Sequence, residues 1–383
     1  MGRCGRAGMS GRWLFNSISI AIGLVLFAVW GYPLRQRAWS GENDFLQLYA
    51  GARLVGTPEL YDVEASKRIH REVTAGHTYY PSVYYTRLPY YALWLSPLGK
   101  LPYRTAYWIY QAISLVVLAA FLIAYTRRWP ETPVLAALSV PLLVNFVNGQ
   151  DSGLAAALAG FAVLAARGGR EFFAGVLLSL CSIKVHLFLL VPLVVLLHRR
   201  WAILSGAVIG GSGLMAWSIL ADGFGWPGRF LNAVRNPELH PGPEHMTTFR
   251  NLANYLSGGD NSTLELAMSL ATAALVAYLV WRIRNFEVAF GVALAGGLLV
   301  CHHAYTQDLL LLFLAALLFA TAPASGVLRG VSVTAALPPT AFLLLSDHPW
   351  SALVPLLLLS VLLAAFADVS HRPASPATGN HAA

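Results

Sequence analysis

One acidic residue stands out for the place it takes in the chain. Asp44 follows a long apolar run and directly precedes a segment with the pattern of an amphipathic helix. A carboxylate held there can accept the proton of a hydroxyl group and make its oxygen a better nucleophile as a bond forms. It can equally cap the helix that follows, as Asn43 can, and the two oxygens allow both roles at once. Asp44 is therefore a candidate general base or a helix cap.

Three basic residues are candidates for binding a phosphate group. Lys184 lies between apolar runs that end at Ile183 and begin at Val185. A lysine inside a bilayer costs a few kcal/mol unless it snorkels to the interface or is paired. Lys184 is thus either a snorkelling residue or a cation that stabilises the charge developing on a phosphate leaving group. Arg87 and Arg250 are further candidates for phosphate contact, although Arg250 also suits a solvated position.

Other polar residues fall in turns between apolar runs. Gln150 is a candidate for contact with the same ligand, and its neighbour Asp151 is equally suited to capping a helix. His302 and His303 begin a further helix, with Asp308 about one turn beyond them. Imidazoles there can contact phosphate or sugar, or form interfacial hydrogen bonds. A metal site needs more ligands in a defined geometry, so we expect no metal and no other cofactor.

The composition is that of a membrane protein. Hydrophobic residues make up 57% of the 383 residues and charged residues 11%, whereas soluble domains average about 25% charged. The net charge of +8 is explained by membrane topology, and we expect no nucleic-acid partner. Cys4, Cys181 and Cys301 have no zinc or disulfide spacing. Walker, Rossmann and HExxH motifs are absent from the sequence, which argues against a soluble nucleotide-sugar enzyme.

Hydropathy predicts an all-α integral membrane protein with about twelve transmembrane helices. The apolar run that contains two prolines, 88–99, covers only about 18 Å as a helix, less than the ~30 Å bilayer core. We expect it to be interfacial or re-entrant, and we expect the first run to be an uncleaved helix rather than a signal peptide. The predicted spans are 14–33, 103–126, 131–147, 152–166, 171–183, 185–198, 201–220, 262–281, 286–301, 304–320, 327–345 and 350–367.

Basic residues predict which side of the membrane each loop faces. If 88–99 does not span and the N-terminus is cytoplasmic, five short arginine-bearing loops fall inside, as the positive-inside rule requires. If 88–99 spanned, all five would move outside. The prediction is one membrane domain over 1–370, with outer loops at 34–102 and 221–261, and a disordered cytoplasmic tail over 371–383. The candidate residues then gather on the outer face.

The first outer loop has two predicted helices. Residues 44–56 carry one apolar stripe, as in a helix lying on the membrane surface. Residues 62–75 form a more polar helix, with Asp62 as its N-cap and Glu64 and Arg68 as a charge pair one turn apart. Tyrosines between 79 and 91 suit a headgroup boundary or stacking on sugars.

Four motifs occur in an order and spacing that resemble those of a known family. They are Asn43-Asp44-Phe45…Leu60-Tyr61-Asp62, Leu88-Pro89…Leu101-Pro102…Trp108, Asn148-Gly149-Gln150, and Gly175…Lys184…Arg199-Arg200-Trp201. Over roughly residues 40–255 the chain resembles glycosyltransferase family 87, within the C-type superfamily of integral membrane glycosyltransferases. Leu88-Pro89 and Lys184-Val185 stand where that family has Pro-Pro and Lys-Pro.

The resemblance implies the C-type fold and an inverting transfer of a sugar, usually mannose, from a polyprenyl-phosphate donor. It implies a bacterial inner-membrane location, an active site on the extracytoplasmic (periplasmic) side, and a lipid-linked or polysaccharide acceptor. It assigns the base to Asp44 and implies that no metal is needed. Family members also include arabinofuranosyltransferases, so arabinofuranose is an alternative donor sugar.

A lipid-linked-sugar transporter, or flippase, is the alternative from another class. It predicts polar residues through the bilayer midplane and two pseudo-repeated halves. The polar residues here crowd one face, and no repeat is visible in the sequence. A non-enzymatic accessory protein is a third interpretation. Loss of a glycan on deletion of the protein, without rescue by the Asp44→Asn variant, would argue against it.

Overall fold

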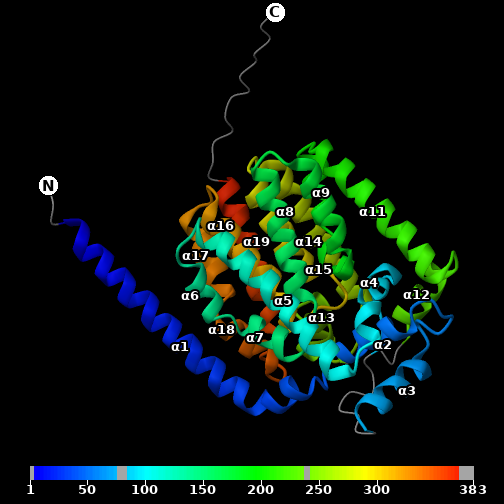
Figure 1. Cartoon of the computed structure of the whole chain (residues 1–383). Coiled ribbons are helices and arrows are strands. Elements are labelled where there is room, and N and C mark those ends of the chain that lie inside the picture. Colours follow the sequence, from blue (N-terminus) through cyan, green and yellow to red (C-terminus); the bar gives the residue numbers. More distant parts are fainter. Residues whose placement is uncertain (1–3, 76–83, 237–241, 371–383) are drawn as a thin grey trace, which may run out of the picture.

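A computed structural model of the chain describes residues 4–75, 84–236 and 242–370 (Figure 1). These parts are helical and contain no strand, which confirms the all-α class. The predicted disordered tail, 371–383, and part of the tyrosine-rich stretch, 76–83, lie outside the described residues.

Nineteen α-helices and three short 3₁₀ helices (η) make up these described parts. In chain order they are α1 (Cys4–Ser40), α2 (Phe45–Leu54), α3 (Val63–Val73), α4 (Pro89–Gly99), α5 (Tyr103–Thr126), α6 (Thr132–Ala137), α7 (Val140–Val147), α8 (Ser152–Arg167), α9 (Glu171–Leu180), η1 (Cys181–Phe188), α10 (Val191–Leu197), α11 (Trp201–Asp222), α12 (Trp226–Val234), η3 (Pro243–His245), α13 (Phe249–Ser257), α14 (Ser262–Arg282), α15 (Phe286–Val300), η4 (Thr306–Leu309), α16 (Leu310–Thr321), α17 (Gly326–Ala335), α18 (Pro338–Leu345) and α19 (Leu353–Ser370).

The chain is membrane-embedded, but fewer helices than predicted are long enough to cross a bilayer. Among the described residues, five helices have the required length and apolar composition, or up to seven if each of two bent pairs counts as one span. Several predicted spans are broken or short: 131–147 divides into α6 and α7, and 185–198 into part of η1 and α10. The expectation for 88–99 agrees with the structure, because α4 has only 11 residues.

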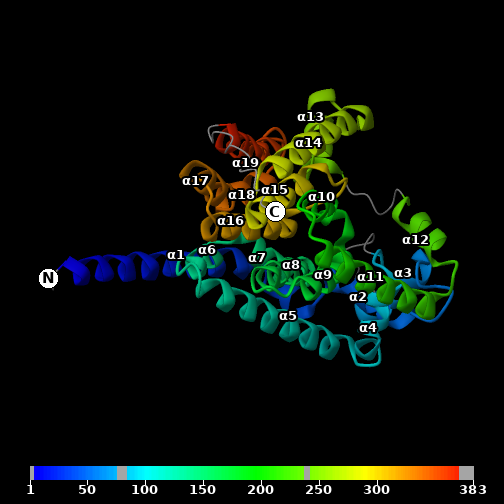
Figure 2. The same ribbon diagram turned by 90° about the horizontal axis from the view of Figure 1, so that it is seen from above.

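Two short apolar helices form the centre of the bundle. α15 and α16 are buried almost throughout their length, and they pack against each other. A helix that is apolar all round needs burial on every side, which a central position provides. Figure 2 shows longer helices, among them α5, α14 and α19, around this centre. The apolar residues of 286–301 and 304–320 therefore serve helix packing.

Helix α2 is a buried helix rather than a surface one. Nine of its ten residues are buried, and it packs against α3, α4 and α5. The expectation of a single apolar stripe on the membrane surface was therefore wrong. The opposite face also carries Leu46 and Leu54, and Ala50 and Ala52 leave room for neighbouring elements to approach closely.

Helix α3 confirms one sequence prediction and corrects another. The carboxylate of Asp62 accepts a hydrogen bond from the Ala65 N–H at 2.7 Å, as an N-cap does. The predicted pair of Glu64 with Arg68 is wrong. Arg68 instead reaches back to Glu59, at 2.9 Å, and Glu64 pairs with Lys67 at 2.8 Å, because a neighbouring turn brings Glu59 within reach.

Close approach of α9 and α11 depends on a small residue. At Gly206 a Cβ atom would fall on the backbone carbonyl of Phe172 in α9. We expect Gly206→Ala to lower the free energy of unfolding by about 1–3 kcal/mol, the range typical of overpacking. Gly211→Ala on the same helix is the matched control, because nothing lies within 4 Å of its Cβ position. Thermal unfolding in one detergent measures both variants, and equal melting temperatures would contradict this packing.

Candidate active site

The turn that carries Asp44 is fixed to the end of α7. The Asp44 N–H donates to the carbonyl of Asn148 at 3.1 Å, and the Asn43 side-chain amide donates to the carbonyl of Val147 at 2.8 Å. The Asn43 Oδ1 atom also accepts from the Phe45 N–H at 3.0 Å, whereas the Asp44 carboxylate makes no capping hydrogen bond. Asn43 therefore provides the local cap, and the Asp44 carboxylate is left for another role.

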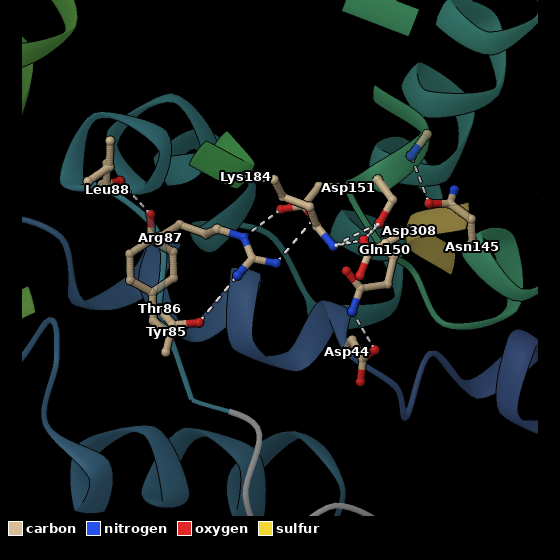
Figure 3. A network of polar contacts seen from close by, with 12 residues as sticks. Asp44, Tyr85, Thr86, Arg87, Leu88, Asn145, Gln150, Asp151, Lys184 and Asp308 are labelled. Atoms are coloured by element: carbon tan, nitrogen blue, oxygen red, sulfur yellow. Dashed lines mark hydrogen bonds and ion pairs between the residues drawn. The ribbon is translucent and has the colours of Figure 1, made fainter. Parts of the chain in front are cut away.

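Gln150 holds the carboxylate of Asp44. Its Nε2 atom donates to Asp44 Oδ2 at 2.5 Å, as Figure 3 shows. Gln150 follows Gly149, whose φ of +59° favours glycine, and a Cβ there would lie 2.8 Å from Asn43 Oδ1. The Asn-Gly-Gln turn thus brings Gln150 to a residue 106 positions earlier in the chain.

Aromatic side chains of α5 pack against the residue that follows Asp44. The Phe45 ring packs against Tyr103, Tyr107 and Tyr110, with centroids between 4.9 and 5.7 Å apart. The Tyr107 hydroxyl donates to the carbonyl of Ala38 at the end of α1, at 2.8 Å. These contacts fix both sides of the turn, so the position of Asp44 is set by packed elements.

A second carboxylate, Asp151, binds an arginine. Arg87 donates through Nε at 2.8 Å and through Nη2 at 3.2 Å to the two oxygens of Asp151, the geometry of a bidentate pair. Asp151 opens α8 but makes no capping bond with its side chain. Burial alone would raise the pKa of Asp151, but the charges of Arg87 and Lys184 outweigh it and lower that pKa below the ordinary value. Asp151 is therefore a charge partner rather than a cap.

Lys184 extends this pairing to η4, which carries Asp308. Its Nζ atom donates to Ser152 Oγ at 2.7 Å and to Asp308 Oδ1 at 2.8 Å, and lies 3.5 Å from Asp151 Oδ1. The Asp308 Oδ2 atom accepts from the Tyr305 N–H at 2.9 Å. Lys184 sits at a break in η1, where its φ and ψ of −134° and 54° are not helical. The break directs the lysine toward the two carboxylates, as Figure 3 shows.

The four charged groups are buried together. Side-chain exposure is 10% for Arg87, 1% for Asp151, 4% for Lys184 and 2% for Asp308. Two cations and two anions balance, as buried charges require. We call these four residues the charge network.

One polar cavity of about 440 Å³ contains Asp44 and most of the charge network. Asp44 and Gln150 line one part of its wall, and Arg87, Lys184 and Asp308 line another. Further wall residues are Arg37, Gln47, Tyr84, Thr86, Val144, Asn148, His186, His245, His303, Tyr305, Thr306, Gln307 and Leu345. The cavity is large enough for a sugar together with a phosphate group.

A second cavity, of about 370 Å³, adjoins the polar one. The two share Thr86, Arg87, His186 and His303 in their walls. Most other residues of the second cavity are apolar, among them Ile183, Val185, Phe230 and Val234. It shares wall residues in turn with an apolar groove of about 410 Å³ between η1 and α11. The polar space therefore continues through this second cavity, which we call the apolar cavity after most of its unshared residues, into the apolar groove.

The structure brings together five of the seven residues singled out by the sequence. Asp44, Arg87, Gln150, Lys184 and His303 line the polar cavity.

The other two lie elsewhere. His302 lines only the apolar cavity and hydrogen-bonds to Glu265 at 2.8 Å, and Arg250 lines neither cavity and lies 3.5 Å from Asp260. The two histidines lie in the non-helical segment before η4 instead of beginning a helix. Although they are adjacent in the chain, only His303 lines the polar cavity.

Sequence reasoning missed the importance of Asp151 and Asp308 as partners of the cations, and it did not select Arg37 or His186. A signal was present for the aspartates, because an acid bordering an apolar run needs a buried cation. Arg37 and His186 carried no such signal, since their place in the cavity depends on the bend after α1 and the break in η1. In the described part of the chain, no group of three or more His, Cys, Asp or Glu side chains is placed to hold a metal ion.

Comparison with known proteins gave one match. A family model described as glycosyltransferase family 87 matches residues 85–304, more than half of the chain. The matched region contains Arg87, Gln150, Asp151, Lys184 and His303, whereas Asp44 and Asp308 lie outside it. No curated protein and no solved structure matches the chain.

Proposed function

Because the chain belongs to glycosyltransferase family 87, we propose that it transfers a sugar, mannose, from a polyprenyl-phosphate donor to an acceptor hydroxyl with inversion at the anomeric carbon. The acceptor is a lipid-linked glycan or a polysaccharide. The reaction takes place on the extracytoplasmic side of a bacterial inner membrane, among membrane lipids, and uses no metal.

The observation that carries this proposal is the common cavity of Asp44 and the cations. Direct displacement needs a base beside the acceptor and hydrogen-bond donors beside the leaving group. Asp44 and Gln150 line one part of the cavity, while Arg87, Lys184 and His303 line another. The space between them accommodates the sugar.

In this mechanism Asp44 takes the proton of the acceptor hydroxyl. The hydroxyl oxygen forms a bond to the anomeric carbon as the bond from that carbon to the phosphate oxygen breaks. The electron pair leaves with the phosphate, and the product is a polyprenyl phosphate. Charge on the leaving group is stabilised by N–H donors in the opposite wall, because preorganised donors need little reorganisation as the charge develops.

The apolar cavity beside the polar one accounts for the lipid part of the donor. A polyprenyl chain avoids water, so the phosphate must lie where a polar space meets an apolar one. Arg87 and His303 line both cavities, so the phosphate is placed at the boundary beside them. The donor is then oriented with its sugar toward Asp44 and its tail toward the groove between η1 and α11.

The test of this function is transfer by the purified protein in lipid nanodiscs. Polyprenyl-phosphomannose is supplied with candidate acceptors, and polyprenyl-phosphoarabinose tests the alternative sugar. We expect mannose transfer together with release of polyprenyl phosphate. Movement of the intact donor across a vesicle membrane, without cleavage, would favour a flippase instead.

Gln150 offers a separate prediction. Its amide hydrogen bond to Asp44 orients the carboxylate toward the cavity, and hydrogen bonds to charged groups contribute about 1.5–3 kcal/mol. We expect Gln150→Leu to lower kcat about tenfold to a hundredfold, with little change in the KM for the donor. Gln47→Leu is the control, because Gln47 lines the cavity but makes no hydrogen bond to Asp44. Equal rates for the two variants would contradict the positioning role.

A further inference from the structure

The ammonium group of Lys184 is already surrounded by acceptors. It donates to Ser152 and Asp308, and a second carboxylate, from Asp151, lies 3.5 Å away. An ammonium has three protons, so little donor capacity remains for a ligand. A phosphate that approached Lys184 would also meet both carboxylates.

The charge network offers no excess positive charge. Its two cations and two anions cancel, and Arg87 already uses two of its nitrogens on Asp151. A phosphate bound beside this network needs at least one further donor that is not part of it.

His186 is such a donor and lies at the right boundary. It lines both the polar and the apolar cavity, and the residue is only partly buried. In the described part of the chain no side chain hydrogen-bonds to its imidazole, although the His303 ring lies 6.3 Å away, centroid to centroid. Either neutral tautomer, and the protonated form, presents an N–H group to a ligand.

We infer that His186 donates a hydrogen bond to the phosphate of the polyprenyl donor, and that Lys184 is a positioning residue that holds Asp151 and Asp308. This inference rests on the proposed function and specifies which group touches the phosphate. The tail then runs past Ile183 and Val185, and the sugar faces Asp44.

Binding of farnesyl phosphate, with farnesol as the uncharged probe, tests this assignment in detergent micelles. We expect His186→Leu to weaken farnesyl phosphate binding about tenfold or more and to leave farnesol binding unchanged. His186→Gln keeps an N–H donor and is expected to restore most of the affinity. His198→Leu is the matched control, because His198 lines neither of these cavities, and it should keep the wild-type affinity for both probes.

Lys184 is tested by a charge-balanced double variant, Lys184→Met with Asp308→Asn. Because it removes one cation and one anion, we expect farnesyl phosphate affinity to stay within about threefold of the wild type. Wild-type affinity in His186→Leu, or a tenfold loss in the double variant, would overturn the assignment. If the wild-type protein bound neither probe, the proposed function itself would fail.

Discussion

Replacing Asp44 by asparagine is expected to lower the rate of sugar transfer by about 10²- to 10⁴-fold, the usual contribution of a general base. An amide is similar in shape, and its oxygen can still accept the hydrogen bond from Gln150, so the turn should keep its structure. Because the base acts only in the transition state, kcat should fall while the KM for the donor changes little. Steady-state kinetics with polyprenyl-phosphomannose measures both.

Glu42→Gln is the matched control for Asp44→Asn. Glu42 lies in the same turn but does not line the polar cavity. It should keep the wild-type rate. A rate close to wild type in Asp44→Asn would remove Asp44 as the base, even if the family assignment stands.

Replacing Lys184 by methionine is expected to cost about 3–5 kcal/mol of stability, the range for removing one partner of a buried ion pair. The change leaves the Asp308 carboxylate, which is 2% exposed, without its cation. The Lys184→Met/Asp308→Asn double variant should recover much of this loss, because the uncompensated charge is gone. Thermal unfolding of the purified variants in one detergent measures the effect.

Arg68→Met is the control for this stability prediction. Its pair with Glu59 is exposed, and exposed pairs contribute about 0–1 kcal/mol. We expect a melting temperature near that of the wild type. If Lys184→Met had the same melting temperature as Arg68→Met, the charge network would contribute little to the stability of the fold.

Local patterns in the sequence predicted those features that depend on nearby residues. The proline-containing run 88–99 was expected not to span, and α4 is indeed short. Asp62 was expected to cap the next helix, and it does. These outcomes follow from helix length and from hydrogen bonds within a few positions of the chain, which a sequence displays directly.

Features that depend on packing between distant segments were harder to predict. The burial of α2 required knowing that α3, α4 and α5 close around it. Twelve spans were predicted, whereas five helices of the described residues, or up to seven with the two bent pairs, have the length and composition of a span. The central helices α15 and α16 are as apolar as lipid-facing ones. Hydropathy alone does not distinguish burial in protein from contact with lipid.

The site likewise combines features that nearby residues predict with features that depend on distant segments. The turn types and the isolated charges indicated Asp44, Gln150 and Lys184, which line one cavity. The pairing of Arg87 with Asp151 joins residues 64 positions apart, and that of Lys184 with Asp308 joins residues 124 apart. Such partners are chosen by the fold, so the sequence indicated the charges but not their pairing.

The central claim is that Asp44 activates an acceptor for direct displacement of polyprenyl phosphate. The most direct measurement is the anomeric configuration, by NMR, of the sugar that the purified protein transfers from polyprenyl-phosphomannose. Our account predicts a product of inverted configuration, formed with one polyprenyl phosphate per transferred sugar. A product that retained the configuration of the donor would contradict it.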